Sequence, residues 1–151
     1  MGVEALRHAL SQYRLLMLDT MVFSYQLADH PMYAPLTTII LKAIESGVIA
    51  GLSTTVTLAE LLTVPAKAGN RQGIQDYELY VSNFPNLRLV PFDTVLARET
   101  AIVRAMTGLR MPDAAQVAAA RVYGADAIVT NDRRWMGKFT VPALILLETY
   151  L

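Results

Sequence analysis

The amino-acid sequence predicts an α/β fold with a parallel sheet that is covered on both faces. Short apolar runs alternate with longer segments of helical period, which is the signature of βαβ units. Hydrophobic residues make up 54% of the chain and charged residues only 17%, below the roughly 25% of an average soluble domain. This balance favours a buried sheet and is compatible with an apolar subunit interface. The length is that of one ordinary domain, so we expect a single domain over residues 1–151, in which residues 1–13 can form an N-terminal helical extension.

Five apolar runs are the candidate strands. The first, residues 15–18, ends directly before Asp19. The fourth, residues 127–130, is followed by Asn131 and Asp132. The others are residues 48–52, 87–90 and 143–146. Their short length and separation by helical patterns predict neighbouring parallel strands.

Helix starts and stops lie between these runs. Thr54 or Thr55 is suited to cap a helix that carries Leu58, Leu61 and Leu62. Asp93 is suited to cap the helix after the third strand. Pro112 suits a first helical turn, followed by an alanine-rich run that Gly124 ends. The sequence therefore predicts a helix directly before the fourth strand.

Charge and cysteine content exclude several classes of site. The formal net charge is +0, so the chain lacks the overall basic excess of many nucleic-acid-binding proteins. There are no cysteines, which excludes disulfides, thiolate metal sites and cysteine nucleophiles. The N-terminus does not have the pattern of a secretory signal, and the most apolar stretch, residues 34–56, contains Lys42 and Glu45. We expect a cytoplasmic protein that does not associate with a membrane.

Four acidic residues occupy positions that point to chemistry. Asp19 and Asp132 follow the first and fourth strands, Glu60 lies in the helix after the second, and Asp113 opens the helix before the fourth. Ligands of open parallel sheets collect beyond the carboxyl ends of the strands, where these side chains can meet. Crowded carboxylates repel one another unless a cation compensates them, and oxygen ligands suit Mg²⁺ or Mn²⁺. Such a cation suits phosphodiester hydrolysis.

Four segments that contain these acids resemble the motifs of the PIN-domain family, in family order. The resemblance runs from residue 15 to residue 135 and rests on the strings LDTMV at 18–22, TLAELL at 57–62, PDAAQVAAA at 112–120 and AIVTNDRRW at 127–135. It implies a three-layer α/β/α sandwich around a parallel sheet of four to five strands. It also implies endoribonuclease activity with Mg²⁺ or Mn²⁺. Met21 departs from the pattern, which has a short polar residue there.

Carried over by position, the resemblance assigns the acids to metal binding and catalysis. Asp19, Glu60 and Asp113 would be metal ligands, and Asp132 would complete the acidic pocket and help to hold a metal or its water. The polar groups implied to orient these carboxylates are Thr20 and either Thr130 or Asn131. Three arginines beside the motifs, Arg110, Arg133 and Arg134, are candidates to bind RNA phosphates.

Chains of this length most resemble the VapC-type toxins of toxin–antitoxin pairs. That resemblance implies an RNA substrate, a cognate antitoxin that occupies the active-site groove, and a homodimer. It leaves the RNA target, the antitoxin and the role of residues 1–13 open.

Other interpretations of the same residues remain. Asp19 and Asp132 can be turn residues, Glu60 a solvated helix residue, and Asp113 a helix-start acid that favours the dipole. A PIN-like module that binds RNA or protein without cutting is the main alternative function. A phosphatase or phospho-receiver domain is a weaker one, because the first strand lacks the acid pair that those classes use there.

Overall fold

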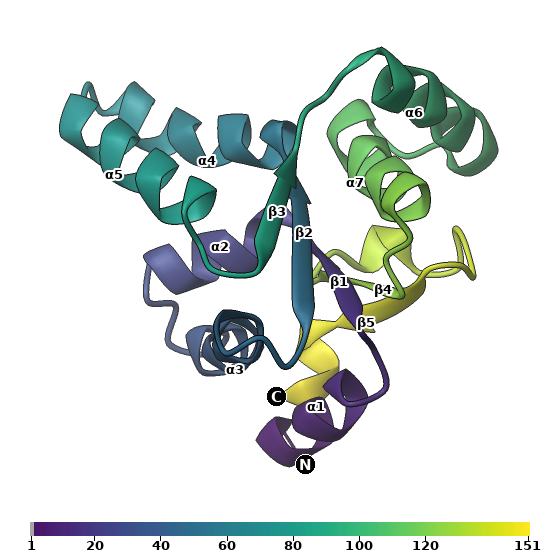
Figure 1. Ribbon diagram of the computed structural model, residues 1–151, viewed down its shortest axis with the longest axis horizontal. Coiled ribbons are helices and arrows are strands. Elements are labelled where there is room, and N and C mark those ends of the chain that lie inside the picture. Colours follow the sequence, from purple (N-terminus) through teal and green to yellow (C-terminus); the bar gives the residue numbers. More distant parts are fainter. Residues whose placement is uncertain (1) are drawn as a thin grey trace.

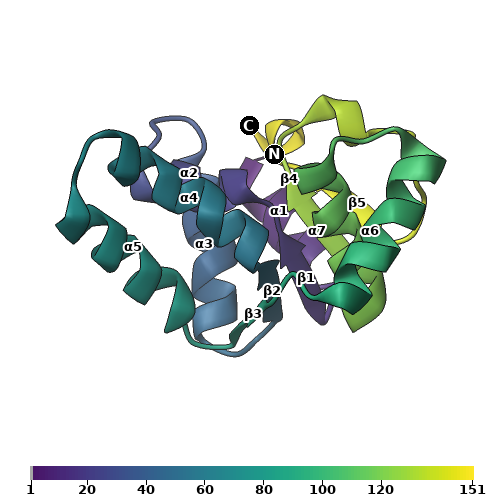
Figure 2. The ribbon, with the colours of Figure 1, turned by 90° about the horizontal axis from the view of Figure 1, so that it is seen from above.

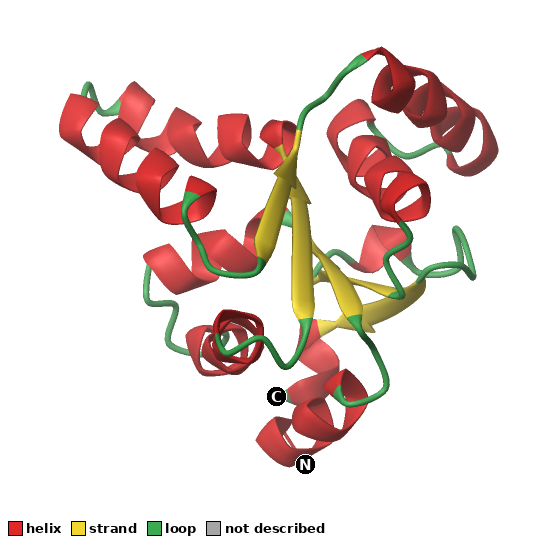
Figure 3. Cartoon of the chain, viewed as in Figure 1, coloured by secondary structure: helices red, strands yellow, loops and turns green. Residues whose placement is uncertain are grey.

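The sheet has five parallel strands in the order β3-β2-β1-β4-β5. The computed structural model describes residues 2–151. Helices lie on both sides of the sheet (Figure 3), so the predicted α/β fold with a central parallel sheet is confirmed. The strands are β1 (Leu15–Leu18), β2 (Ala50–Thr54), β3 (Leu87–Val90), β4 (Ala127–Thr130) and β5 (Ala143–Leu146).

The helices form the two outer layers, as the view from above shows (Figure 2). Helices α2 to α5 lie on one side of the sheet, and α6 with α7 lies on the other (Figures 1 and 2). The N- and C-terminal ends lie near each other at one end of the molecule (Figure 1). The helices are α1 (Gly2–Leu10), α2 (Thr20–Leu27), α3 (Ala34–Glu45), α4 (Thr55–Lys67), α5 (Arg71–Ser82), α6 (Thr94–Thr107) and α7 (Met111–Tyr123), with short 3₁₀ helices η1 (Arg133–Trp135) and η2 (Leu147–Tyr150).

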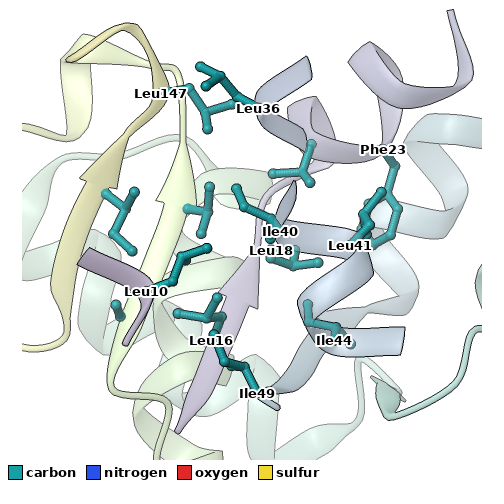
Figure 4. Close-up of a cluster of buried hydrophobic side chains, with 14 of the residues drawn as sticks. Leu10, Leu16, Leu18, Phe23, Leu36, Ile40, Leu41, Ile44, Ile49 and Leu147 are labelled. Atoms are coloured by element: carbon teal, nitrogen blue, oxygen red, sulfur yellow. The ribbon is translucent and has the colours of Figure 1, made fainter. Parts of the chain in front are cut away.

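Two hydrophobic cores follow from the alternation of side chains along the strands. Leu16 and Leu18 of β1 point into the core shared with α1 to α5, where they lie with Ile40 and Ile44 (Figure 4). Met17, between them, joins the second core under α6 and α7. Successive residues of a strand face opposite sides of a sheet, so one four-residue strand contributes to both cores.

The second strand begins and ends two residues later than the predicted 48–52. Val48 is 77% exposed, and the backbone N–H groups of Val48 and Ile49 donate to the Ala43 carbonyl, so both residues complete the end of α3. At the other end, Ser53 and Thr54 continue the strand although both are polar. Ser53 Oγ donates to the Leu18 carbonyl and Thr54 Oγ1 to Gln116 Oε1, so buried partners satisfy both hydroxyls.

The predicted starts of α4, α6 and α7, and the predicted end of α7, agree with the structure. Thr54 caps α4, since its hydroxyl accepts from the Thr57 N–H, and Asp93 caps α6 by accepting from the Leu96 N–H. Pro112 lies in the first turn of α7, and Gly124 ends that helix in the left-handed conformation at φ +75°.

The strand order places a switch point at β1. The chain builds outward from β1 through β2 to β3, then crosses to the other side of β1 for β4 and β5. Ligand sites of open α/β sheets lie beyond the carboxyl ends of the two strands at such a point, here β1 and β4. None of the helices between residues 2 and 151 is long and apolar enough to cross a membrane.

Candidate active site

Asp19 lies at the centre of the carboxyl edge, directly after β1, and is only 6% exposed. Its Oδ2 accepts a hydrogen bond of 2.7 Å from Thr130 Oγ1 at the end of β4. Its Oδ1 accepts one of 2.8 Å from the Thr20 N–H, which makes Asp19 the N-cap of α2. Both partners are neutral donors, so they fix the carboxylate without cancelling its charge.

The pKa of Asp19 reflects this environment. The pKa of Asp19 is raised from 3.8 to about 6, mainly by burial. The hydrogen bonds from Thr130 and Thr20 oppose this rise, and the negative charges of Asp113 and Glu60 add to it. A buried carboxylate is unfavourable when it is ionised and has no compensating charge. The site therefore contains a negative charge that a cation would stabilise.

Glu60 reaches the same edge from α4, the helix after β2. The residue is exposed, but its Oε1 accepts a hydrogen bond of 2.7 Å from Thr20 Oγ1. Thr20 thus contacts two of the four acids, one through its backbone N–H and one through its hydroxyl.

Asp113 lies in the first turn of α7, with a side chain that is 15% exposed. Its Oδ2 lies 3.6 Å from Arg110 Nε. Burial raises the pKa of Asp113, Arg110 and Arg134 lower it, and Asp132 and Glu60 raise it. Asp113 therefore lies close enough to Asp132 and Glu60 for their negative charges to raise its pKa.

Asp132 follows β4 and begins the short helix η1. Its Oδ1 accepts from the Arg134 N–H at 2.9 Å, and its two carboxylate oxygens accept from the Arg134 guanidinium. These hydrogen bonds hold the pKa of Asp132 below its usual range. Asp132 is therefore also a turn residue, as the alternative interpretation predicted. A residue can cap a turn and belong to the acidic cluster at the same time.

Two of the other predicted residues have partners outside the acidic cluster. Asn131 donates from Nδ2 to the Tyr25 hydroxyl and accepts from the Glu148 N–H, so its amide does not contact the four acids. Arg133 forms an ion pair with Glu148. Thr20 and Thr130, by contrast, both donate hydroxyl protons to the acids.

A cavity of about 330 Å³ adjoins Asp113 and has a cationic wall. Arg110, Arg134 and Lys138 line it, together with Gly108 and Leu109 of the loop between α6 and α7. Lys138 was missed by the sequence interpretation because it lies beyond the last motif. Gln116 was missed too, although one glutamine among the buried alanines of α7 is a visible signal.

The donor chemistry of the cluster fits a hard divalent cation. The four acids supply only oxygen atoms, which Mg²⁺ and Mn²⁺ prefer, and the buried charge of Asp19 lacks a basic partner among the hydrogen bonds described. Within residues 2–151, however, no three Asp, Glu or His side chains are grouped closely enough to hold an ion as they stand. Arg110 and Arg134 engage two of the acids instead.

The comparisons with known proteins agree with this architecture. Residues 16–146 match the family described as PIN domain. No curated protein sequence matches the chain.

Several solved structures have a similar fold. VapBC2 from Rickettsia felis, bound to a DNA fragment from its promoter, has a TM-score of 0.69 and 17% identity, and the match covers 87% of this chain and 98% of that one. DNA-bound VapBC from Salmonella typhimurium has a TM-score of 0.68 and 19% identity, covering 89% and 98%. VapC20 from Mycobacterium tuberculosis, described as a sarcin–ricin loop cleaving toxin, has a TM-score of 0.65 and 12% identity, covering 85% and 98%. At these identities the likeness shows the fold alone.

Proposed function

The chain belongs to the PIN-domain family, and we propose that it is a metal-dependent endoribonuclease that hydrolyses RNA phosphodiester bonds with Mg²⁺ or Mn²⁺. The main support for this proposal is the environment of the Asp19 carboxylate. Its carboxylate is buried, held only by neutral donors, and close enough to Asp113 and Glu60 for their charges to raise its pKa. A site that concentrates negative charge in this way is suited to a divalent cation.

Asp19, Glu60 and Asp113 would hold the cation, with Asp132 completing the pocket. When bound, the cation supplies an activated water and neutralises charge on a phosphoryl oxygen. Thr130 and Thr20 keep the carboxylate oxygens of Asp19 and Glu60 in place through the hydrogen bonds already described. Ligands that are oriented before binding lose less entropy when the site assembles.

Arg110, Arg134 and Lys138 are the proposed contacts for RNA phosphates. They line one cavity next to Asp113, and the two arginine side chains are 68% and 63% exposed. Exposed ion pairs exchange partners at little cost. Each guanidinium can therefore leave its carboxylate for a phosphate oxygen when RNA enters. Arg133 is the weakest of the candidates named from sequence, because Glu148 already engages it.

Substitution of the buried acid tests the proposal. Asp19→Asn and Asp113→Asn are each expected to lower the rate of RNA cleavage more than about 100-fold, beyond the 10- to 100-fold typical of residues that only support a metal ligand. Asp93→Asn is the matched control, because Asp93 also follows a strand and caps a helix, and asparagine caps equally well. Circular dichroism would verify the fold. Wild-type cleavage rates in both purified variants would overturn the assignment.

A PIN-like module that binds RNA or protein without cutting is the second candidate. It is favoured by the absence of a preassembled three-ligand group in the part of the chain that the structure describes, residues 2–151. Calorimetry with Mn²⁺ on the purified protein separates the two functions. Binding at or below millimolar Mn²⁺ supports the nuclease, and no heat of binding at that concentration supports the module.

We further propose that the protein is the toxin of a toxin–antitoxin pair, is cytoplasmic and forms a homodimer. The support is the fold that it shares with VapBC proteins over nearly their full length. A short neighbouring reading frame whose product co-purifies with this chain and inhibits cleavage is the expected finding. Light scattering on the purified chain tests the dimer.

A further inference from the structure

We propose that Gln116 is a positioning residue, which fixes the Glu60 carboxylate through a relay of two threonine hydroxyls. The relay consists of Gln116, Thr57, Thr20 and Glu60. It connects α7 to α4 and α2 across the carboxyl edge of the sheet. The inference rests on the proposed metal-dependent function, because positioning of Glu60 matters most if Glu60 binds the cation.

An unbroken series of hydrogen bonds forms the relay. Gln116 Nε2 donates to Thr57 Oγ1, Thr57 Oγ1 lies 3.1 Å from Thr20 Oγ1, and Thr20 Oγ1 donates to Glu60 Oε1 at 2.7 Å. At its other end, Gln116 Oε1 accepts from Thr54 Oγ1 at 3.1 Å.

The number of available protons determines which group donates and which accepts in each hydrogen bond of the relay. A carboxylate only accepts, so the single hydroxyl proton of Thr20 is used on Glu60. Thr57 must then be the donor to Thr20, and its oxygen is free to accept from the Gln116 amide. The Gln116 carbonyl in turn accepts from Thr54. Each of the three threonine hydroxyl protons is used once, and one amide proton and the carbonyl oxygen of Gln116 both have partners in this orientation.

Burial makes this arrangement rigid. Gln116 is 1% exposed, and Thr54 and Thr57 are fully buried. A buried amide or hydroxyl that loses its partner is strongly unfavourable, so these side chains are held in one arrangement. The exposed Glu60 is thereby linked, through the half-buried Thr20, to side chains that burial holds in place.

Packing alone does not account for a glutamine at this position. The surrounding buried residues of α7 are alanines and a valine, and an apolar side chain would fill the same space without the desolvation of an amide. Gln116 also lies one helical turn beyond Asp113, so α7 carries one acid of the cluster directly and anchors a second through the relay. A shift of α7 would move both acids together.

Removal of one hydroxyl from the relay is the primary test. Thr57→Val keeps the shape of the side chain and removes the central link, and it is expected to weaken Mn²⁺ binding 10- to 100-fold in calorimetry, as is typical for groups that orient a metal ligand. Thr57→Ser keeps the hydroxyl and should restore affinity to within about threefold. Thr100→Val is the matched control, because Thr100 is also buried but donates only to the Leu96 carbonyl of its own helix.

A double-mutant cycle tests whether Gln116 and Thr57 act through one relay. Gln116→Met removes both polar ends of the amide at similar volume and is expected to weaken Mn²⁺ binding in the same direction. The double variant Gln116→Met/Thr57→Val should then be no weaker than the worse single variant, because both changes break the same series of bonds. Additive losses would overturn the relay and leave two independent effects on the fold.

A readout without metal distinguishes failure of the relay from failure of the proposed function. Methyl-labelled threonine NMR reports the side-chain rotamer of Thr20, which should be single in the wild type and averaged in Gln116→Met and Thr57→Val. An unchanged rotamer, or Mn²⁺ affinities equal to wild type in both variants, would overturn the relay alone. Absence of Mn²⁺ binding by the wild type would overturn the metal-dependent function and, with it, the relay's role there.

Discussion

The inner and outer parts of the acidic cluster are held by different chemistry. Asp19, in the inner part, is 6% exposed and receives its side-chain hydrogen bonds from a threonine hydroxyl and a backbone N–H. Asp113 and Asp132, in the outer part, are paired with Arg110 and Arg134, whose side chains are mostly exposed. The inner charge is thus oriented but uncompensated, and the outer charges are compensated by groups that can leave.

Because of this difference, one cluster can bind both a cation and a polyanion. Neutral donors preserve the attraction of Asp19 for a cation, because they add no positive charge next to it. The arginines at the outer part lower the repulsion between carboxylates before substrate arrives, and they remain available for phosphates afterwards.

Neutralising the inner acid should stabilise the metal-free protein. The rise of the Asp19 pKa from 3.8 to about 6 corresponds to about 3 kcal/mol of destabilisation at pH 7. Asp19→Asn removes that charge but weakens the hydrogen bond from Thr130, which offsets roughly 1 kcal/mol. We expect the free energy of unfolding at pH 7 to increase by about 2 kcal/mol, measured by urea denaturation in EDTA.

The destabilisation caused by the buried Asp19 carboxylate should depend on pH. Below pH 3.8 the Asp19 carboxyl is protonated in both states and contributes nothing. Between 3.8 and about 6 the folded state keeps the proton that the unfolded state loses, so stability falls as pH rises and the full penalty is present above 6. The gain from Asp19→Asn should therefore disappear as the pH falls from 7 to 4. A gain that is constant over this range would contradict a buried, uncompensated charge.

The strands and helix starts near the site were predictable because local rules govern them. The run at residues 15–18 is apolar and ends at an acid, and Asp93 and Pro112 occupy positions that helix starts favour. The second strand was displaced because hydrophobicity alone made Val48 a strand residue and treated Thr54 as outside. Its true extent depends on buried partners from α7 and β1, which no local pattern reveals.

The contacts within the site were harder to predict, because tertiary packing determines them. No local pattern distinguishes Thr130 from Asn131 as the group that orients the carboxylates. In the structure, the hydroxyl of Thr130 donates to Asp19 and the amide of Asn131 is directed at Tyr25 and Glu148. The pairing of each arginine with its acid likewise depends on how η1 and α7 lie against the sheet.

In the outer part, loss of Arg134 should weaken RNA binding in a salt-dependent way. Arg134→Ala is expected to lower affinity for single-stranded RNA by about 1 kcal/mol, and to reduce the slope of log affinity against log salt by about 0.7, the value for one phosphate contact on a single strand. Fluorescence anisotropy in EDTA measures both without cleavage. Arg133→Ala is the control, since Arg133 is adjacent in sequence but engages Glu148. Equal slopes for the two variants would exclude Arg134 from the phosphate contacts.

The smallest effect is expected from the pair of Arg110 with Asp113. The arginine is 68% exposed and the two charged groups are 3.6 Å apart, so Arg110→Ala should change the free energy of unfolding by less than about 0.5 kcal/mol in urea denaturation. Arg110 lowers the pKa of Asp113, so the variant should also raise that pKa, as followed by carboxyl NMR. A loss above about 1 kcal/mol would show that this pair is integral to the fold. The outer part would then be as firmly held as the inner part, and Arg110 could not leave Asp113 to bind an RNA phosphate.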